Sequence, residues 1–165
     1  MDREHHGGVD QAVYLFGEDD RLWWQDTLKR DVGPGFFGEN LLIDGLSSQQ
    51  ICIGDQFQIG DVVLEITAPR IPCATYAAHI GSGQAIKQFY AAARPGAYAR
   101  VLQEGRIRPE AQVTYVPYTG IRVKVIEMMA QYLRRYSDPE FLQRVLHTPA
   151  HYKMHQEARR RLGKP

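Results

Sequence analysis

The sequence predicts a mainly β fold, a barrel or a sandwich, with a few peripheral helices and a small three-helix annex at its C-terminal end. As far as Pro117, short runs of alternating apolar and polar residues are separated by glycine-containing turns, which is typical of closely spaced strands. After Thr119 the apolar periodicity becomes helical and the turn signals stop. We therefore expect a barrel domain over residues 1–118 and a helical extension over residues 119–165.

Composition narrows the function classes. The chain has 165 residues with 44% hydrophobic content, enough for one core, and its 20 basic and 19 acidic residues leave a net charge of +1, which argues against nucleic-acid binding. Two cysteines do not make a disulfide framework. No apolar run approaches the roughly 18 residues of a membrane span, and no hydrophobic leader is evident. We expect a cytoplasmic protein with free thiols and a small-molecule or protein partner.

The predicted strands lie in four segments, "AVYLF", "GENLLIDGL", "ICIGDQFQIGDVVLEITAP" and "AYARVLQEGRIRPEAQVTYV". Gly-Asp occurs twice in the third segment, at 54–55 and 60–61, and suits a tight turn at both places. Between the strands, "EDDRLWWQDTLKRD" and "GQAIKQFYAAAR" place apolar residues at helical spacing. Both segments are expected to be helices that cover the β core.

The annex begins with "RVKVIEMMAQYLRRY", which is predicted to be its first helix. In "SDPEFLQRVLH", Ser137 and Glu140 fit a capping box at the start of the second helix. In "TPAHYKMHQEARRRLG", Thr148 is the expected N-cap of the third helix and Gly163 its terminator.

Cys73 is the first candidate for chemistry. In "APRIPCATYAAHIG" two prolines stiffen the backbone before the cysteine, so its thiol is expected at the exit of a rigid turn. Arg70 stands three residues earlier and can favour the thiolate, the form that attacks electrophiles or binds a soft metal. The alternative is a buried structural cysteine, a description that suits Cys52 within its apolar strand better.

Two other segments offer polar groups. In "HHGGVDQAV", the Gly7-Gly8 pair allows a sharp turn or close approach to a bound group, and His6 and Asp10 flank it. In "GPGFFGENLLIDGL", Glu39 and Asn40 stand at a strand entrance, where they can bind a polar ligand or simply cap the local backbone.

Other motifs give weaker evidence for a functional site. His151 and His155 are four residues apart on a predicted helix, but "HYKMH" lacks the glutamate of the zinc-protease motif and a third ligand. The sequence contains neither a phosphate-binding glycine loop nor a serine nucleophile elbow.

In this order, "HHGGVDQAV", "GFFGENLLIDGL" and "IGDQFQIGDVVLEITAPRIPC" resemble the MOSC domain, the family named for the C-terminal domain of molybdenum cofactor sulfurases. The likeness covers residues 3–117 and is strongest to the stand-alone bacterial branch that includes the hydroxylaminopurine resistance protein. The helices after Thr119 resemble the three-helix extension of that branch.

The resemblance implies a β-barrel in which Cys73 ligates the metal of a molybdenum–pterin cofactor (molybdopterin) and is the catalytic residue. The implied cofactor-binding residues are His6, Gly7, Gly8, Asp10, Glu39, Asn40 and Arg70. Relatives reduce N-hydroxylated bases and amidoximes, a detoxifying reaction, with electrons from a separate reductase, so a flavin or iron–sulfur donor is expected in trans. Pyridoxal phosphate is not expected, since no aminotransferase-type region precedes the domain.

Two other functions stay open at this point. Cys73 could accept sulfane sulfur in a sulfur-carrier domain, or the chain could be a non-catalytic barrel that binds other proteins. Family members usually carry about fifty residues before the His-Gly-Gly motif, so early strands of the barrel are expected to be missing here. Unpaired strand edges then predict a homodimer or poor solubility.

Overall fold

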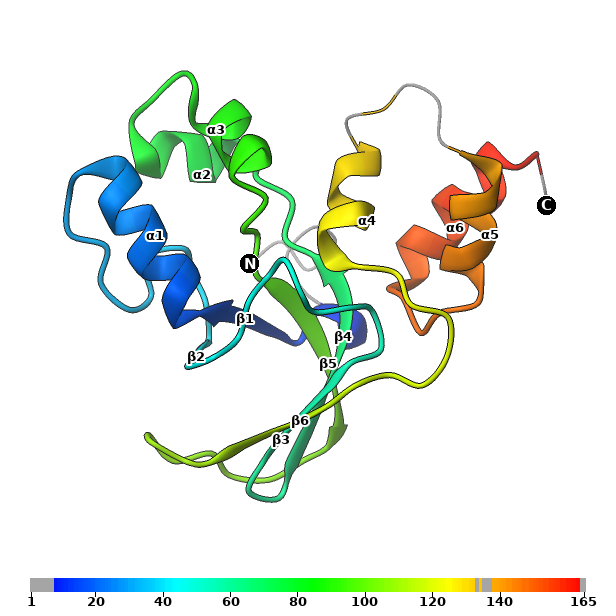
Figure 1. Ribbon diagram of the computed structural model, residues 1–165, viewed down its shortest axis with the longest axis horizontal. Helices are drawn as coiled ribbons and strands as arrows, with labels where there is room; N and C mark the ends of the chain where they lie inside the picture. The colour runs from blue at the N-terminus through cyan, green and yellow to red at the C-terminus, as the bar shows by residue number, and fades with distance from the viewer. Residues whose placement is uncertain (1–7, 133, 135–137, 164–165) are drawn as a thin grey trace.

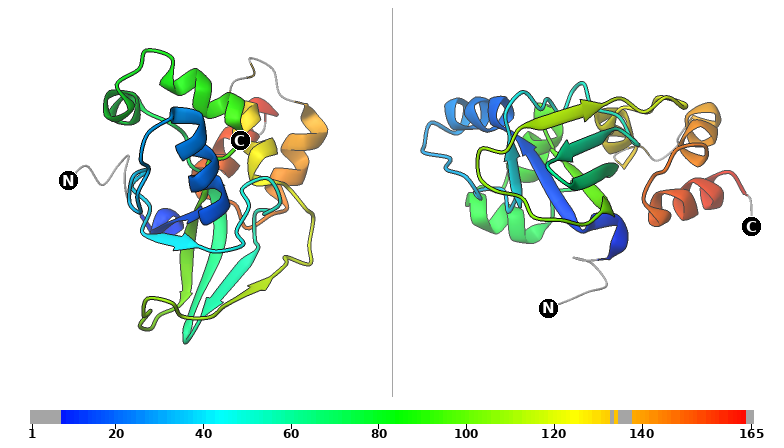
Figure 2. Two further views of the ribbon diagram at one scale, coloured as in Figure 1. Left: turned by 60° about the vertical axis from the view of Figure 1, so that its left-hand side comes forward. Right: turned by 90° about the horizontal axis from the view of Figure 1, so that it is seen from below.

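The computed structural model describes residues 8–132, 134 and 138–163. Its centre is a six-stranded mixed sheet in the order β2-β1-β5-β4-β3-β6. The strands are β1 (Val13–Gly17), β2 (Leu41–Ile43), β3 (Gln56–Ile59), β4 (Val62–Pro69), β5 (Ala97–Gln103) and β6 (Val113–Val116). Only β1 and β2 are parallel, and every other neighbouring pair is antiparallel. The four predicted strand segments are thus confirmed, and the sheet curls into a half-barrel (Figures 1 and 2).

Helices flank the sheet in two groups (Figure 1). A short 3-10 turn, η1 (Val9–Gln11), precedes β1. The first group is α1 (Glu18–Leu28), α2 (Ala74–Ile80) and α3 (Ala85–Ala92), and the second is α4 (Val125–Tyr132), α5 (Pro139–Leu146) and α6 (Tyr152–Arg161). Five of these helices correspond to predicted ones, whereas α2 was not predicted, because the prolines before it indicated only a turn. In the described residues no helix is both long and apolar enough to cross a membrane.

Two buried apolar clusters hold these layers together. One is formed by β-strand residues such as Leu15, Leu64 and Ile66 with Met128 and Phe141 of the second helix group, so the sheet and the C-terminal helices share a continuous core. The other places the rings of Phe16, Trp24 and Phe89 among the first helix group. The boundary between residues 118 and 119 remains a prediction.

Two predicted helix caps are wrong. Asp138 caps α5, since its carboxylate accepts a hydrogen bond from the Glu140 N–H at 3.0 Å; Ser137, the predicted cap, lies outside the described residues. The helix α6 begins three residues later than predicted, where His151 Nδ1 accepts from the Lys153 N–H at 3.0 Å. Thr148 instead donates its hydroxyl to the Val145 carbonyl, ending the preceding turn.

The two Gly-Asp pairs also differ. Gly60-Asp61 forms the exposed hairpin turn between β3 and β4, as predicted. Asp55, by contrast, is fully buried before β3. Its carboxylate accepts from the Cys52 N–H, the Tyr118 N–H and the Tyr115 hydroxyl, and it pairs with Arg122. The Gly54-Asp55 pair therefore ties the segment after β6 to the sheet instead of making a simple hairpin turn.

Candidate functional site

The end of β4 carries the two sequence candidates that the structure brings together. After Pro69 the chain runs through Arg70 to Cys73, which occupies the N-cap position of α2 in an extended conformation, φ −123° and ψ 178°. A bulge lies just upstream: Ile66 pairs with Ala99 and Ala68 with Tyr98, so Thr67 is the extra residue. Because a bulge shifts the phase of all later side chains, it helps to set the direction of the Arg70 segment.

The Cys73 thiol is half-buried, and its surroundings lower its pKa. Burial raises the pKa of the Cys73 thiol, but the facing N–H groups of Tyr76 and Thr75 oppose this effect. The sulfur does not complete a full capping hydrogen bond with either. The Thr75 side chain and the Arg70 charge lower the pKa further, so it lies below its ordinary value. A thiol in such surroundings is a good soft ligand or nucleophile.

Arg70 is held by aromatic residues and not by a carboxylate. Its Nη1 donates to the Tyr98 hydroxyl at 2.9 Å, and its guanidinium carbon lies 5.2 Å from the centre of the Tyr14 ring. Its Nε is buried and has no hydrogen-bond partner. Among the described residues no carboxylate forms an ion pair with Arg70. The site therefore keeps an uncompensated positive charge beside the thiol, which suits an anionic ligand.

Three tyrosines complete the surroundings of Arg70, and the sequence analysis did not identify them. Tyr14 on β1 faces Tyr98 on β5 as a cross-strand pair, with ring centres 5.3 Å apart. Burial raises the pKa of Tyr14 and raises that of Tyr76, on α2, to about 12, so both phenols are neutral near pH 7. Tyr14 and Tyr98 stand in predicted strands, but their convergence on Arg70 depends on strand pairing, which the sequence alone did not give.

Glu39 and Asn40 make backbone contacts beside the site. The Glu39 carboxylate accepts from the N–H groups of Gly35 at 2.6 Å and Phe37 at 3.0 Å. The Asn40 side-chain oxygen accepts from the Tyr14 N–H at 2.7 Å, and the Asn40 N–H donates to the Tyr14 carbonyl at 2.9 Å. Asn40 thus fixes the strand that carries Tyr14. A cofactor-binding role for either residue remains a prediction.

Asp10 contacts the C-terminal helices. Its carboxylate accepts from the Tyr152 N–H at 2.9 Å and lies 3.2 Å from Nη2 of Arg100, while its carbonyl accepts from the Thr67 hydroxyl. Gly8 is exposed with φ +124°, a conformation that favours glycine. His6 and Gly7 lie outside the described residues.

The donor set limits what the site can hold. No group of three or more His, Cys, Asp or Glu side chains suitable for a metal ion occurs in the part of the chain that the structure describes. His151 and His155 instead bond to backbone at the start of α6. A single thiolate beside an unpaired cation fits a metal that arrives within an anionic organic ligand, so the residues present are compatible with a molybdenum–pterin cofactor.

Comparisons with known proteins identify the family of the chain. The model of the MOSC domain family matches residues 2–114. The uncharacterized protein YflK of Bacillus subtilis is 35% identical over 112 residues, 68% of this chain and 51% of that protein. A protein named reductase from Gibberella moniliformis is 34% identical over 106 residues, 62% of this chain and 19% of that protein. The chain thus spans about half, or less, of the length of these relatives.

Solved structures give the same fold. The crystal structure of YiiM from Geobacillus stearothermophilus superposes with a TM-score of 0.86, covering 94% of this chain and 80% of the other at 24% identity.

Proposed function

The chain belongs to the MOSC domain family, and on that premise we propose that it binds a molybdenum–pterin cofactor through Cys73 and reduces N-hydroxylated compounds such as hydroxylaminopurines and amidoximes. The observation that carries the proposal is the pairing of a thiol with a lowered pKa and an Arg70 guanidinium that no carboxylate among the described residues neutralises. The named reductase among the relatives supports a redox role.

Each residue of the site has an assigned part. Cys73 supplies the one protein ligand, and Arg70 balances the negative charge of thiolate and cofactor. Tyr98 orients Arg70 by accepting its hydrogen bond, and the ring of Tyr14 shields the guanidinium from water. His6, Gly7, Gly8, Asp10, Glu39 and Asn40 remain predicted contacts.

When bound, the cofactor supplies two-electron oxygen-atom transfer. The overall reaction, R–NH–OH with two electrons and two protons to R–NH2 and water, breaks the N–O bond. The electrons come from a separate flavin or iron–sulfur protein.

The test is the molybdenum content of the protein, made in a host that synthesises the cofactor. We expect near-stoichiometric metal in the wild type and none in Cys73→Ser, with unchanged circular dichroism. The matched control is Cys52→Ser, because Cys52 is the other free cysteine and is buried. Metal retained in Cys73→Ser, or lost equally in both variants, contradicts the assignment.

Activity is measured separately, with an artificial reduced viologen as electron donor and an amidoxime as substrate. A lowered Cys73 pKa also suits a sulfur carrier. Exposure to a persulfide donor followed by mass spectrometry distinguishes the two functions, since a stable adduct of one sulfur on a metal-free protein favours the carrier.

A further inference from the structure

Two polar side chains, those of Arg30 and His79, have no polar partner within the described chain. Arg30 follows α1, His79 lies in the last turn of α2, and both are exposed. Neither side chain forms an ion pair or a hydrogen bond with another described residue. Both contact the half-buried ring of Phe36, whose centre lies 4.9 Å from the Arg30 guanidinium carbon and 4.7 Å from the centre of the His79 ring. A guanidinium that lies over a ring keeps its N–H donors at its edge, so Arg30 and His79 present N–H donors beside one apolar ring.

The loop that carries Phe36 is fixed against α2. The Glu39 carboxylate accepts hydrogen bonds from the N–H groups of Gly35 and Phe37, so it holds the loop in a tight conformation. Phe37 is buried, and its ring stacks on that of Tyr76, on α2, with the ring centres 6.3 Å apart. The rings of Phe36 and Phe37 are in contact, with their centres 5.1 Å apart. Phe36 therefore has a defined position beside α2.

The helix α2 connects this pair of donors to the thiol. Cys73, Tyr76 and His79 follow one another at intervals of three residues, so successive members of the series are neighbours on the helix surface. His79 thus lies about 9 Å from Cys73 along the helix axis. Burial raises the pKa of Tyr76 to about 12, and the charges of Arg70 and Arg30 both oppose that rise. Both cations therefore act on the tyrosine between Cys73 and His79, which makes Arg30 part of the surroundings of the thiol.

We propose that Arg30 and His79 bind the phosphate group of the substrate, and that this substrate is an N-hydroxylated purine nucleotide instead of the free base. The inference rests on the proposed function, which puts the N–OH group at Cys73, and it assigns the anionic end of the same molecule. Arg30 donates two N–H groups to phosphate oxygens and His79 donates one, a pattern that recognises a phosphate well. The ring of Phe36 offers an apolar contact for the flat base or the sugar.

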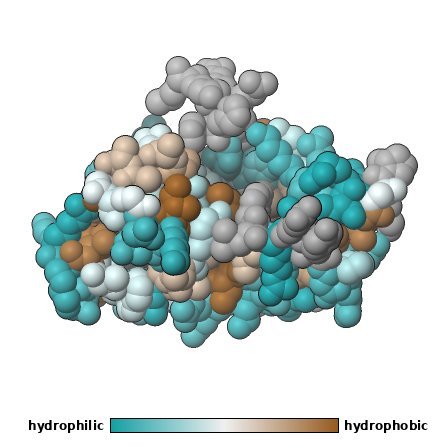
Figure 3. Space-filling view, turned by 90° about the horizontal axis from the view of Figure 1, so that it is seen from above, coloured by the Kyte–Doolittle hydropathy of each residue, from teal (hydrophilic) through white to brown (hydrophobic). Residues whose placement is uncertain are grey.

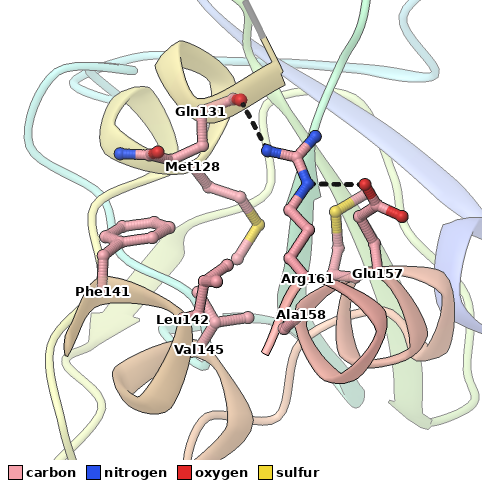
Figure 4. A pocket seen from close by; sticks show the side chains of 9 residues that line it. Met128, Gln131, Phe141, Leu142, Val145, Glu157, Ala158 and Arg161 are labelled. Atoms are coloured by element: carbon pink, nitrogen blue, oxygen red, sulfur yellow. Dashed lines mark hydrogen bonds and ion pairs between the residues drawn. The ribbon is translucent and has the colours of Figure 1, made fainter. Parts of the chain in front are cut away.

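Two other hollows of the described chain suit such a ligand less well. The apolar pocket between α4, α5 and α6 in Figure 4 has a volume of only about 40 Å³, and Arg161 spans it by contacting Glu157 and the Gln131 carbonyl. The hollow of about 360 Å³ between α1 and α3 contains Arg94, but this cation is paired with the buried Asp20. Over the first helix group, on the left of Figure 3, hydrophobic areas lie among hydrophilic residues. A ligand with both a flat ring and a charged group suits a mixed surface of this kind.

The first test is calorimetric binding of adenosine 5′-monophosphate and of adenosine, in a phosphate-free buffer of low ionic strength. We expect the wild type to bind the monophosphate about tenfold more tightly, and Arg30→Gln and His79→Ala to lose most of that preference. The control is Lys29→Gln, because Lys29 is the neighbouring cation and is paired with Asp26. Equal affinity of the wild type for the two probes, or an equal loss in Lys29→Gln, overturns the proposal. Because binding is measured without turnover, protein that shows the preference but holds no molybdenum refutes the proposed function and leaves the phosphate site in place.

The second test compares turnover of N6-hydroxyadenosine and its 5′-monophosphate by the molybdenum-containing protein, with reduced viologen as electron donor. We expect a lower KM for the monophosphate, and in Arg30→Gln a rise of about tenfold in that KM alone, with kcat and the KM for the nucleoside unchanged. Arg30→Lys keeps the charge and should recover part of the difference. The molybdenum content of each variant is measured in parallel. A loss of metal in Arg30→Gln, or an equal effect on both substrates, shows that Arg30 serves the cofactor or the fold and overturns the proposal.

Discussion

Replacement of Asp55 by alanine tests the role of the buried carboxylate that anchors the segment after β6. The Cys52 N–H loses its acceptor at 2.7 Å in a place where Cys52 is only 3% exposed, so water cannot replace it. An unsatisfied buried donor costs about 1 to 3 kcal/mol. Arg122 and Tyr115 are about two-fifths exposed and can turn to water, so their loss adds less.

Together these losses give about 3 kcal/mol, at the low end of the range for breaking a buried charge pair. For a chain of this size that corresponds to a fall in Tm of about 6 to 12 °C. Urea unfolding followed by tryptophan fluorescence measures the difference. Asp61→Ala is the matched control, because Asp61 follows the other Gly-Asp glycine in an exposed turn and is expected to cost under about 0.5 kcal/mol. Equal effects of the two substitutions would refute the reasoning.

Two further predictions concern stability. Burial lowers the pKa of His151 in the folded state, whereas its value in the unfolded chain is about 6.5. The unfolded chain therefore takes up the proton first as the pH falls, so the stability of the fold is intact above about pH 6.5 and decreases below it. His151→Asn keeps an acceptor for the α6 cap and should reduce the difference between urea midpoints at pH 7 and pH 5; an unchanged difference excludes His151 as its source. In Gly96→Ala the new Cβ would lie 2.5 Å from the Leu15 carbonyl oxygen, with φ at +64°, so its free-energy cost should be at least double that of Gly81→Ala. Gly81 has φ +73° but open space around it, so Gly81→Ala measures the backbone strain alone, roughly 1 kcal/mol. Thermal melts of the two variants give the additional cost of the clash at Gly96.

The predictable part of the fold is the part that local patterns determine. The strand segments and five of the six helices follow from the alternation and periodicity of apolar residues. The two Gly-Asp pairs show the limit of this reasoning, since both read as tight turns and only one is a simple hairpin. Asp55 is buried because Arg122 and Tyr115, more than fifty residues later, return to it. No local signal carries that information.

The helix caps fail for a related reason. Thr148 and Pro149 are good residues with which to start a helix, but the carbonyls of Pro149 and Ala150 accept from Arg100 on β5 instead. The main-chain N–H of His151 donates to the Thr67 carbonyl on β4. These contacts hold residues 149–151 against the sheet and delay the helix until Tyr152. Tertiary contacts thus override a local preference.

The candidate site likewise has a part that the sequence predicts and a part that depends on tertiary contacts. Cys73 and Arg70 are close in sequence, so their proximity could be predicted, whereas the tyrosines that hold Arg70 come from β1 and β5. Their convergence requires the β1–β5–β4 register and the extra residue at Thr67 in β4. A slip of one residue would turn Tyr98 to the other face of the sheet and remove the hydrogen bond that the Arg70 guanidinium donates to it. The position of the Arg70 charge beside Cys73 therefore depends on the correct pairing of these three strands.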